Sequence, residues 1–411
     1  MSQPYATLPI HGFRNGAANL FPPDSIEETR RMLSHLCHAI NFARDIQDCE
    51  QVSGGNNNAI LFTCLPLAPE HHNRRISCVL RTCKTTWFKS TPPIDAAMCP
   101  LVALGQKLRA NLNFPIPYTL VYDCTYDNPI RSPYLIQERV LGETLEHEYF
   151  TLHRALELEL ELAHPRNPHM ERRCSYARAV AGFVAAVDRV AMPGYGTFAA
   201  HPSMPRKGVR VRGDFGVTQD HVGGRKIPTA PNFSRWVRDV LGAQMARATD
   251  RLVSLSLEEL WWVEVLCQIG QEMEERGLLT DEPAGLWHSD FWPRNIMVRS
   301  SRDHAVLTGV IDWDEAKSLP RVVTRKPPMF LWSMLANGLF PAEKLEIKNA
   351  FDREMQRLRP ESSYAHDAYD MDRVLVRALC MYALFGPGFA YHDEMSFREL
   401  VDRWNARDRG C

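Results

Sequence analysis

The feature that most constrains this chain is a pair of apolar runs, rich in β-branched residues, that are joined by a short polar segment. Residues 296–299 and 306–311 form the two runs, and residues 300–304 separate them. Apolar runs of this length on either side of a polar turn predict two strands that pair antiparallel as a β-hairpin. The residues at the open end of this hairpin are therefore brought together.

The turn of the hairpin sets which residues face each other. If its centre lies near residues 303 and 304, facing residues have numbers with a constant sum, and Asn295 faces Asp312 at the open end. A carboxamide oxygen and a carboxylate then converge. Such a pair suits Mg²⁺, which usually takes one or two protein carboxylates and leaves its other positions to water and phosphate oxygens. Asn295 and Asp312 are the predicted metal ligands.

Two more polar residues lie on the segment that leads into the hairpin. Asp290 precedes Asn295 by five residues, and His288 precedes Asp290 by two. This is the spacing of the protein-kinase catalytic loop, in which an Asp accepts the hydroxyl proton, an Asn five residues later holds metal, and a downstream Asp holds metal between phosphates. Each short motif is common alone, but their joint spacing is not expected by chance. Asp290 and His288 are the candidate catalytic residues.

The same residues carry a family resemblance. His288, Asp290 and Asn295, followed by residues 311–316, match the signature H-x-D-(x)4-N and I-D-W-x-x-A. The chain in this respect resembles the aminoglycoside phosphotransferase and choline kinase-like family of small-molecule kinases. Weaker matches to this family extend over most of the chain, at residues 115–117, 132–138, 142–145, 194–198 and 327–332.

The resemblance implies a bilobal, protein-kinase-like α+β fold. Residues 1–140 would form an N-terminal lobe with a leading helix and a small antiparallel nucleotide-binding sheet. Residues 141–411 would form a larger, mainly helical lobe that carries the catalytic loop and the metal site.

The smaller lobe contains the expected nucleotide-binding residues. Gly54, Gly55 and Asn57 lie just before an apolar run and resemble the family's loop between the first two strands, where backbone N–H groups face phosphate. The alternative is an ordinary hairpin turn. Strand 76–81 ends in Arg81, whose planar fork suits the α and β phosphates, with Lys84 as the fallback.

The hinge between the lobes is expected near residues 137–141, where backbone groups, including those of Gln137 and Arg139, would meet the adenine edge. One feature departs from the family. A Glu usually pairs with the basic residue at the position of Arg81, but residues 101–108 contain no carboxylate. Either the arginine needs no partner, or Asp95 substitutes, or the lobe binds nucleotide poorly.

Apolar residues at helical spacing predict core helices at about 25–47, 170–190, 256–277, 342–358, 370–384 and 396–407. Ser25 with Glu28, and Ser256 with Glu259, are predicted capping boxes. Leucine and glutamate alternate along residues 156–162, which is the pattern of a strand, but both residues are good helix formers and a helix is predicted there. Residues 201–232 are polar and rich in Pro and Gly, which predicts a long irregular segment such as a surface loop or a lid.

Late acidic residues have two interpretations. In the family, acidic residues of the late helices often bind the acceptor, and here they would suit a cationic substrate. Alternatively, they form a charged face on the exterior of the protein. The candidates are Asp367, Asp370 and Asp372, together with His392, Asp393 and Glu394.

Composition narrows the class of protein. A chain of 411 residues is long enough for two lobes, and its net charge of −1 gives no reason to expect a nucleic-acid partner or an anionic membrane. No apolar run approaches the roughly 20 residues of a membrane span. Eleven cysteines without a C-x-x-C pair, and an N-terminus without a signal-peptide pattern, predict a cytoplasmic protein with reduced cysteines.

The favoured function is transfer of the γ-phosphoryl group of ATP to a hydroxyl of a small-molecule substrate. Asp290 would accept the hydroxyl proton, Asn295 and Asp312 would hold Mg²⁺ between the phosphates, Arg81 would steady the phosphates, and His288 would brace the loop.

Three alternatives remain open at this stage. A pseudokinase or binding protein would explain the missing helix carboxylate, and the same fold can also host another reaction. A metal-dependent hydrolase would use His288, Asp290, His304 and Asp312. This third alternative is the weakest, because His304 falls in the turn of the predicted hairpin, far from Asp312.

Overall fold

The computed structural model covers the whole chain. The structure describes residues 25–52, 57–67, 74–83, 102–105, 108–109, 116–149, 151–152, 169–200, 207–209, 215–218, 220–222, 225–227, 232–249, 256–280, 282–300, 304–386 and 394–407. Gly54, Gly55, Lys84, Asp95, His392, Asp393 and the predicted helix at 156–162 lie outside these residues.

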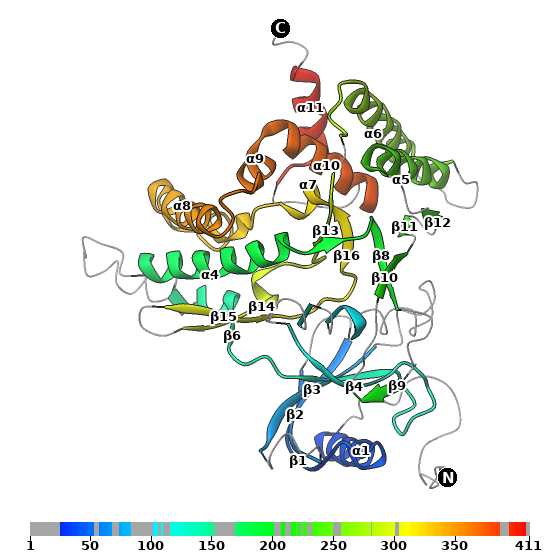
Figure 1. Cartoon of the computed structure of the whole chain (residues 1–411), viewed down its shortest axis with the longest axis vertical. Coiled ribbons are helices and arrows are strands. Elements are labelled where there is room, and N and C mark those ends of the chain that lie inside the picture. The colour runs from blue at the N-terminus through cyan, green and yellow to red at the C-terminus, as the bar shows by residue number, and fades with distance from the viewer. Residues whose placement is uncertain are drawn as a thin grey trace. The chain divides into compact units, whose positions relative to one another are not determined.

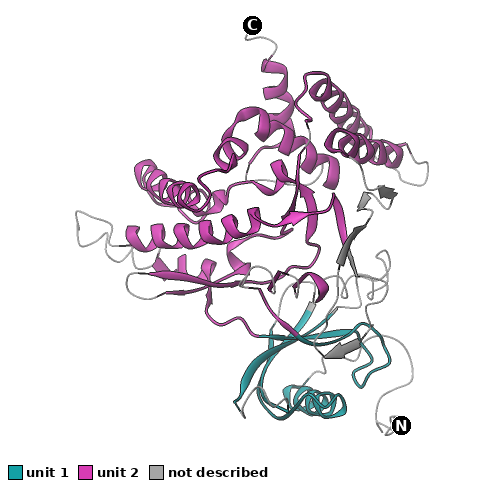
Figure 2. Ribbon diagram, viewed as in Figure 1, with its two compact units in different colours: residues 1–95, 120–138, 206–209 teal, residues 96–119, 139–205, 210–411 magenta. Residues whose placement is uncertain are grey.

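The chain divides into two compact units (Figure 2). Unit 1 contains Met1–Asp95, Leu120–Glu138 and Arg206–Val209, and unit 2 contains Ala96–Thr119, Arg139–Pro205 and Arg210–Cys411. Unit 1 is built on one antiparallel sheet, whereas unit 2 is mainly helical with smaller sheets. The predicted α+β, bilobal fold class is confirmed.

The sheet of unit 1 has six strands in the order β1-β2-β3-β5-β4-β9 (Figure 1). The strands are β1 (Ala43–Val52), β2 (Asn57–Pro66), β3 (Ile76–Cys83), β4 (Thr119–Asp123), β5 (Tyr134–Glu138) and β9 (Lys207–Val209). β1 and β2 pair antiparallel and flank residues 53–56, so the hairpin that was predicted around the Gly-rich segment is confirmed by its two strands. β3, which was predicted as a strand, pairs with β2 and β5.

The predicted leading helix is shorter than expected. α1 spans Ile26–Ala39, and its N-cap Ser25 accepts a hydrogen bond from the Glu28 N–H at 3.2 Å, which is one half of the predicted capping box. The extension to residue 47 was wrong. Asn41 adopts a left-handed φ of 52°, which ends the helix, and the chain then enters β1. Pairing with β2 along residues 43–52 outweighs the helical spacing of the apolar residues.

The helices predicted at about 170–190, 256–277, 342–358, 370–384 and 396–407 are present. They are α4 (Met170–Asp188), α6 (Leu257–Glu275), α8 (Pro341–Leu358), α10 (Met371–Phe385) and α11 (Phe397–Arg407), joined by α5 (Phe233–Ala248), α7 (Arg321–Thr324), α9 (Tyr364–Tyr369) and the 3-10 helices η3 (Pro293–Asn295) and η4 (Met329–Leu331). The capping box at the start of α6 is confirmed, with Ser256 and Glu259 bonded in both directions. Within the described residues, none of the helices has the length and apolarity to traverse a bilayer.

The described residues of unit 2 also form three sheets. β10 (Phe215–Thr218), β8 (Gly196–Ala200), β16 (Lys317–Pro320), β13 (Ala284–Trp287) and β7 (Ala191–Met192) form one, β15 (Ala305–Val310), β14 (Ile296–Ser300) and β6 (Glu143–Thr144) form the second, and β11 (Asp220–Val222) pairs with β12 (Arg225–Ile227). Four short strands therefore fall within residues 201–232. The prediction of a wholly irregular segment was wrong, because short stretches of it find pairing partners in β4 and β8.

Cys37, Cys49, Cys64, Cys78, Cys174, Cys267 and Cys380 are free thiols. Cys64 and Cys78 lie on neighbouring strands with their sulfur atoms 3.9 Å apart. Burial raises the pKa of the Cys37 thiol, and contact with Cys64 together with burial raises the pKa of the Cys78 thiol. These thiols are therefore weak nucleophiles.

Gly142 allows the chain to pass close to β14. Its φ is 129°, and a Cβ atom at this position would lie 2.4 Å from the backbone oxygen of Val298. The next residues form β6, which pairs with β14 through Glu143 and Val298. The glycine of the predicted G-x-x-L motif is thus required both by the backbone angle and by the close approach.

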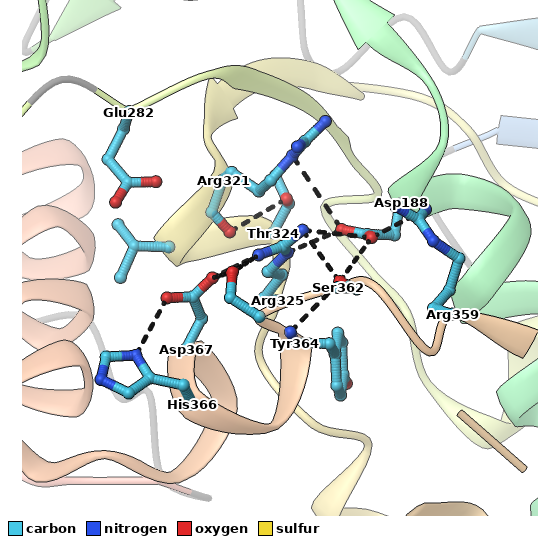
Figure 3. Close-up of polar contacts among 12 residues, drawn as sticks. Asp188, Glu282, Arg321, Thr324, Arg325, Arg359, Ser362, Tyr364, His366 and Asp367 are labelled. Atoms are coloured by element: carbon cyan, nitrogen blue, oxygen red, sulfur yellow. Dashed lines mark hydrogen bonds and ion pairs between the residues drawn. The ribbon is translucent and has the colours of Figure 1, made fainter. Parts of the chain in front are cut away.

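A buried group of charges joins the ends of three helices of unit 2 (Figure 3). Arg325, which follows α7, donates to Asp188 at the end of α4, with an Nε–Oδ1 distance of 2.7 Å, and also to Asp367 on α9. These side chains are only 5, 2 and 7% exposed. Arg359 adds a second ion pair to Asp188 at 2.9 Å. Because every carboxylate here has a partner, burial of the charges is tolerated.

We expect Gly142→Ala to lower the free energy of unfolding by about 3 kcal/mol, since it combines backbone strain with overpacking. Gly182→Ala is the matched control: this residue is in α4 and has open space around its Cβ position, so the change should stabilise by about 0.5 to 1 kcal/mol. Denaturant unfolding of both variants checks the pair. Equal stabilities would contradict the close approach.

Arg325→Met should lower the free energy of unfolding by about 3 to 5 kcal/mol, because Asp188 and Asp367 would lose a buried partner. The comparison variant is Arg403→Met, whose pair with Glu399 is about half exposed and should contribute about 0.5 kcal/mol or less. Chemical denaturation measures both. A small effect at Arg325 would show that the two carboxylates find other partners.

Candidate active site

The predicted hairpin is confirmed, but its register differs by one residue at the open end. β14 and β15 pair antiparallel from Ser300 with Ala305 to Ile296 with Val310. The Ile311 N–H then donates to the backbone oxygen of Asn295 at 2.9 Å. Asn295 therefore lies opposite Ile311, and Asp312 follows one residue later.

The centre of the hairpin lies one residue earlier than predicted, because Ser300 pairs with Ala305, and this alone would displace the register by two residues. A β-bulge then restores one of these two residues. Met297 pairs with Gly309, whereas Val298 pairs with Leu307, so Thr308 is an extra residue on β15. A bulge of this kind places two residues of one strand opposite one of the other and changes the register beyond it. The constant-sum prediction was wrong because it placed the centre of the turn one residue too late and allowed for no bulge.

Asp312 has an uncommon backbone conformation. Its φ is 63°, and Glu315, three residues later, has a φ of 62°. A left-handed backbone costs a non-glycine residue about 1 to 2 kcal/mol, although Asp tolerates it better than most. Such strain tends to be retained at functional positions. It directs the chain away from β15 just after the last hairpin pair.

Asp290 and Asn295 are in direct contact. The Asn295 Nδ2 donates to the backbone oxygen of Asp290 at 2.9 Å and to its carboxylate Oδ2 at 2.7 Å. The tight turn of η3 brings the two together, because the Trp292 N–H donates to the Asp290 oxygen and the Asn295 N–H donates to the Trp292 oxygen. Asn295 is only 6% exposed. Its amide nitrogen is thus occupied, and the amide oxygen is the atom suited to a cation.

Arg294 is a site residue that the sequence analysis missed. Its Nη2 donates to both carboxylate oxygens of Asp290, at 2.7 and 2.9 Å. The side chains are 57% and 30% exposed. The signal that was available in the sequence was the i, i+4 spacing of an acidic and a basic residue around the predicted catalytic position.

His288 is buried and neutral. The Asp290 N–H donates to its Nδ1 at 3.1 Å, and its Nε2 lies 3.0 Å from the backbone oxygen of Ile311. With Nδ1 accepting, Nε2 carries the proton and donates. Burial lowers the pKa of His288 to about 4, against the opposing effects of the Ile311 carbonyl and Asp290. The imidazole also meets the Trp313 ring edge-on at 4.6 Å.

Three hydrogen bonds tie the loop 288–295 to the segment that follows β15. They run from His288 to the Ile311 carbonyl, from the Ile311 N–H to the Asn295 carbonyl, and from the Ser289 hydroxyl to the Asp314 carbonyl at 2.8 Å. The backbones that carry Asp290, Asn295 and Asp312 are therefore linked to one another.

Aromatic residues of the loop 288–295 pack against α4 and η4. Phe291 stacks on Phe183 of α4 at 5.1 Å and meets Phe330 of η4 at 6.0 Å. Trp292 also lies against Phe330, at 6.1 Å. Residues 327–332, which were noted for their family resemblance, thus take part in positioning the loop.

Arg81, Gln137 and Asn57, which are predicted nucleotide-binding residues, lie on the strands of unit 1. Arg81 faces Leu135 and Val79 faces Gln137 across β3 and β5, so Arg81 and Gln137 lie on the same face of the sheet. Asn57 begins β2, opposite Cys83. Arg139 is the first residue after β5 and belongs to unit 2.

The late acidic residues take part in contacts within unit 2. Asp367 is buried against Arg325 and Arg373, and Glu394 pairs at 2.6 Å with Arg377, whose side chain is fully buried. For these two residues, the interpretation as a charged exterior face was wrong. Asp370 caps α10, and Asp372 pairs with Arg407 at 2.5 Å.

The hydrolase alternative is not supported by the hairpin. His304 directly precedes β15 at the closed end, whereas Asp312 follows the open end. Among the residues that the structure describes, no group of three or more His, Cys, Asp or Glu side chains is placed to hold a metal ion.

Comparison with solved structures finds remote likenesses. A thermostable mutant of aminoglycoside phosphotransferase APH(4)-Ia, in a ternary complex with ADP and hygromycin B, is 16% identical, with 92% of this chain and 93% of that chain covered and a TM-score of 0.45. A macrolide 2'-phosphotransferase type I is 12% identical over 92% and 96%, with a TM-score of 0.43. Plasmodium vivax ethanolamine kinase is 10% identical over 93% and 89%, with a TM-score of 0.41. No curated protein sequence matches the chain.

The decisive comparison is with a protein family. The sequence model of the phosphotransferase enzyme family matches residues 73–323, more than half of the chain. The match includes the loop 288–295, the hairpin and Asp312. The chain belongs to the phosphotransferase enzyme family, and the enzyme class predicted from its motifs is confirmed.

Proposed function

We propose that this protein is a small-molecule kinase that transfers the γ-phosphoryl group of ATP, with Mg²⁺, to a hydroxyl group of its substrate. The observation that carries this proposal is the contact of Asp290 with Asn295 on a loop that is hydrogen-bonded to the segment of Asp312. Family membership supports the type of reaction. The proposal adds the nucleotide, the metal and the kind of acceptor.

The residues present fit a magnesium site. Asn295 is held by its amide nitrogen, so its oxygen is the available ligand atom, and Asp312 contributes a carboxylate from a strained backbone position. One carboxylate and one neutral oxygen are a typical protein contribution to Mg²⁺. When bound, the ion would neutralise charge on the phosphates of ATP.

Asp290 is proposed to orient the acceptor hydroxyl and to accept its proton as the phosphoryl group is transferred. Its backbone oxygen and its carboxylate are both held by Asn295, so the carboxylate has a defined direction. Transfer of this type depends mainly on positioning and on charge neutralisation, because the protein forms no covalent bond in it.

Nucleotide contacts are proposed for six further residues. They are Gly54, Gly55, Asn57, Arg81, Gln137 and Arg139. Arg81 and Gln137 share one face of the unit 1 sheet, which is compatible with a common ligand. The backbone groups of Gln137 and Arg139 are proposed to meet the adenine edge, and the backbone N–H groups of Gly54, Gly55 and Asn57 are proposed to face phosphate.

His288 is proposed to brace the loop as a neutral imidazole. Both ring nitrogens already have partners within the protein, one as acceptor and one as donor. The ring therefore cannot take a substrate proton without breaking one of these bonds. Its role is to hold the Asp290 backbone at a set distance from Ile311.

Calorimetric titration with ATP, with and without Mg²⁺, tests the proposal. Asp312→Ala should weaken Mg²⁺-dependent ATP binding about tenfold or more, through loss of a charged ligand. Asp290→Asn should leave this binding near the wild-type value while lowering phosphoryl transfer about 10²- to 10⁴-fold. A wild-type protein that binds no ATP under either condition would favour a pseudokinase or another use of the fold.

The neutral His288 predicts a loss of stability in acid. Its folded-state pKa of about 4 lies below the ordinary 6.5, so the unfolded chain binds this proton more tightly. The contribution is present above pH 6.5 and is lost as the pH falls toward 4, up to about 3 kcal/mol. Denaturant unfolding at several pH values should show a flatter dependence for His288→Gln. Identical slopes in the two proteins would refute the assignment.

A further inference from the structure

The 3-10 turn of the loop fixes the position of Arg294 beside Asp290. This arginine is the central residue of η3, between Pro293 and Asn295, and the turn places its side chain beside that of Asp290. Both oxygens of the Asp290 carboxylate accept from Arg294 Nη2, and Oδ2 also accepts from Asn295. The carboxylate proposed to accept a proton is thus neutralised by an adjacent cation in this structure.

This arrangement opposes the function proposed for Asp290. Both oxygens of this carboxylate already accept hydrogen bonds, so part of its capacity to accept one from an acceptor hydroxyl is used. Arg294 must therefore move, or act on the reaction itself, when an acceptor hydroxyl approaches Asp290.

Arg294 differs from the structural arginines of unit 2. Arg325 and Arg377 are at most 5% exposed, and each bonds several partners through more than one nitrogen. Arg294 is 57% exposed, and its contacts in the described part of the chain run through Nη2 alone. An exposed pair of this type exchanges partners readily.

We propose that Arg294 is a catalytic residue that leaves Asp290 for the phosphoryl group of ATP as that group is transferred. This inference rests on the proposed function. A phosphoryl group carries more negative charge than a carboxylate and accepts the planar fork of a guanidinium through two oxygens. The exchange would release Asp290 for the acceptor hydroxyl and would place positive charge where negative charge develops.

The proposed step is balanced. The bond between the γ-phosphorus and the bridging oxygen of ATP breaks, and the new bond forms between that phosphorus and the acceptor oxygen. The acceptor proton passes to Asp290, and ADP leaves with the electron pair of the broken bond. Arg294 donates hydrogen bonds throughout and changes no covalent bond.

The test uses Arg294→Met, which keeps the length of the side chain and removes its charge. We expect near wild-type affinity for Mg²⁺-ATP, because the contact develops mainly in the transition state. Affinity for ADP with Mg²⁺ and aluminium fluoride, an analogue of the transferring phosphoryl group, should fall about 10²- to 10³-fold, as should the rate of ATP hydrolysis in the absence of an acceptor. Arg294→Lys should recover part of both losses by restoring charge.

Arg299→Met is the matched control, since this arginine is exposed on β14 of the same hairpin. It should leave both affinities unchanged, and thermal unfolding of each variant reports whether it is folded. Unchanged or faster hydrolysis in Arg294→Met would overturn the inference, as would an equal loss of affinity for ATP and for the analogue. If the wild-type protein binds no ATP, the proposed function itself fails. If the wild-type protein binds and hydrolyses ATP and Arg294→Met behaves in the same way, the proposed function stands and this inference fails.

Discussion

The hydrogen bond from the His288 imidazole to the Ile311 carbonyl is the interaction on which the candidate site most depends. It joins the loop that carries Asp290 to the segment that carries Asp312, and the same ring accepts the N–H of Asp290 itself. Burial keeps the imidazole neutral, which preserves one donor and one acceptor. A charged ring would lose the acceptor and with it the hold on Asp290.

Around this bond, unit 2 uses two different kinds of support. Apolar packing of Phe291 and Trp292 on α4 and η4 fixes the loop without directional demands. Farther away, buried ion pairs centred on Arg325 and Arg377 join α7, α9 and α10 to the segments beside them. Such pairs are strongly destabilising when one partner is removed, because the remaining charge stays buried. Asp367 and Glu394, which were candidates for binding a cationic acceptor, are the carboxylates of these buried ion pairs.

Much of the fold was predictable because its signals are local. The capping residues Ser25 and Ser256 marked helix starts correctly, and the late helices followed the spacing of their apolar residues. Errors arose where strand pairing decides. Residues 43–47 joined a strand, because β2 offers a pairing partner, and short parts of residues 201–232 became strands beside β4 and β8. The helical spacing of residues 25–47 concealed the first of these strands, and β4 and β8 are not visible in the local pattern of residues 201–232.

The sequence by itself determined the family of the protein and the type of reaction. The spacing of His288, Asp290 and Asn295, with Asp312 beyond two apolar strands, was enough to predict a phosphotransferase, because these side chains and intervals are set by covalent connectivity. Only the tertiary structure decided the register at Asp312, the partner of Asp290 and the burial of Asp367. A bulge at Thr308, a turn that brings Arg294 back onto Asp290, and arginines from distant helices decide these points. They depend on contacts between atoms that the linear pattern does not place.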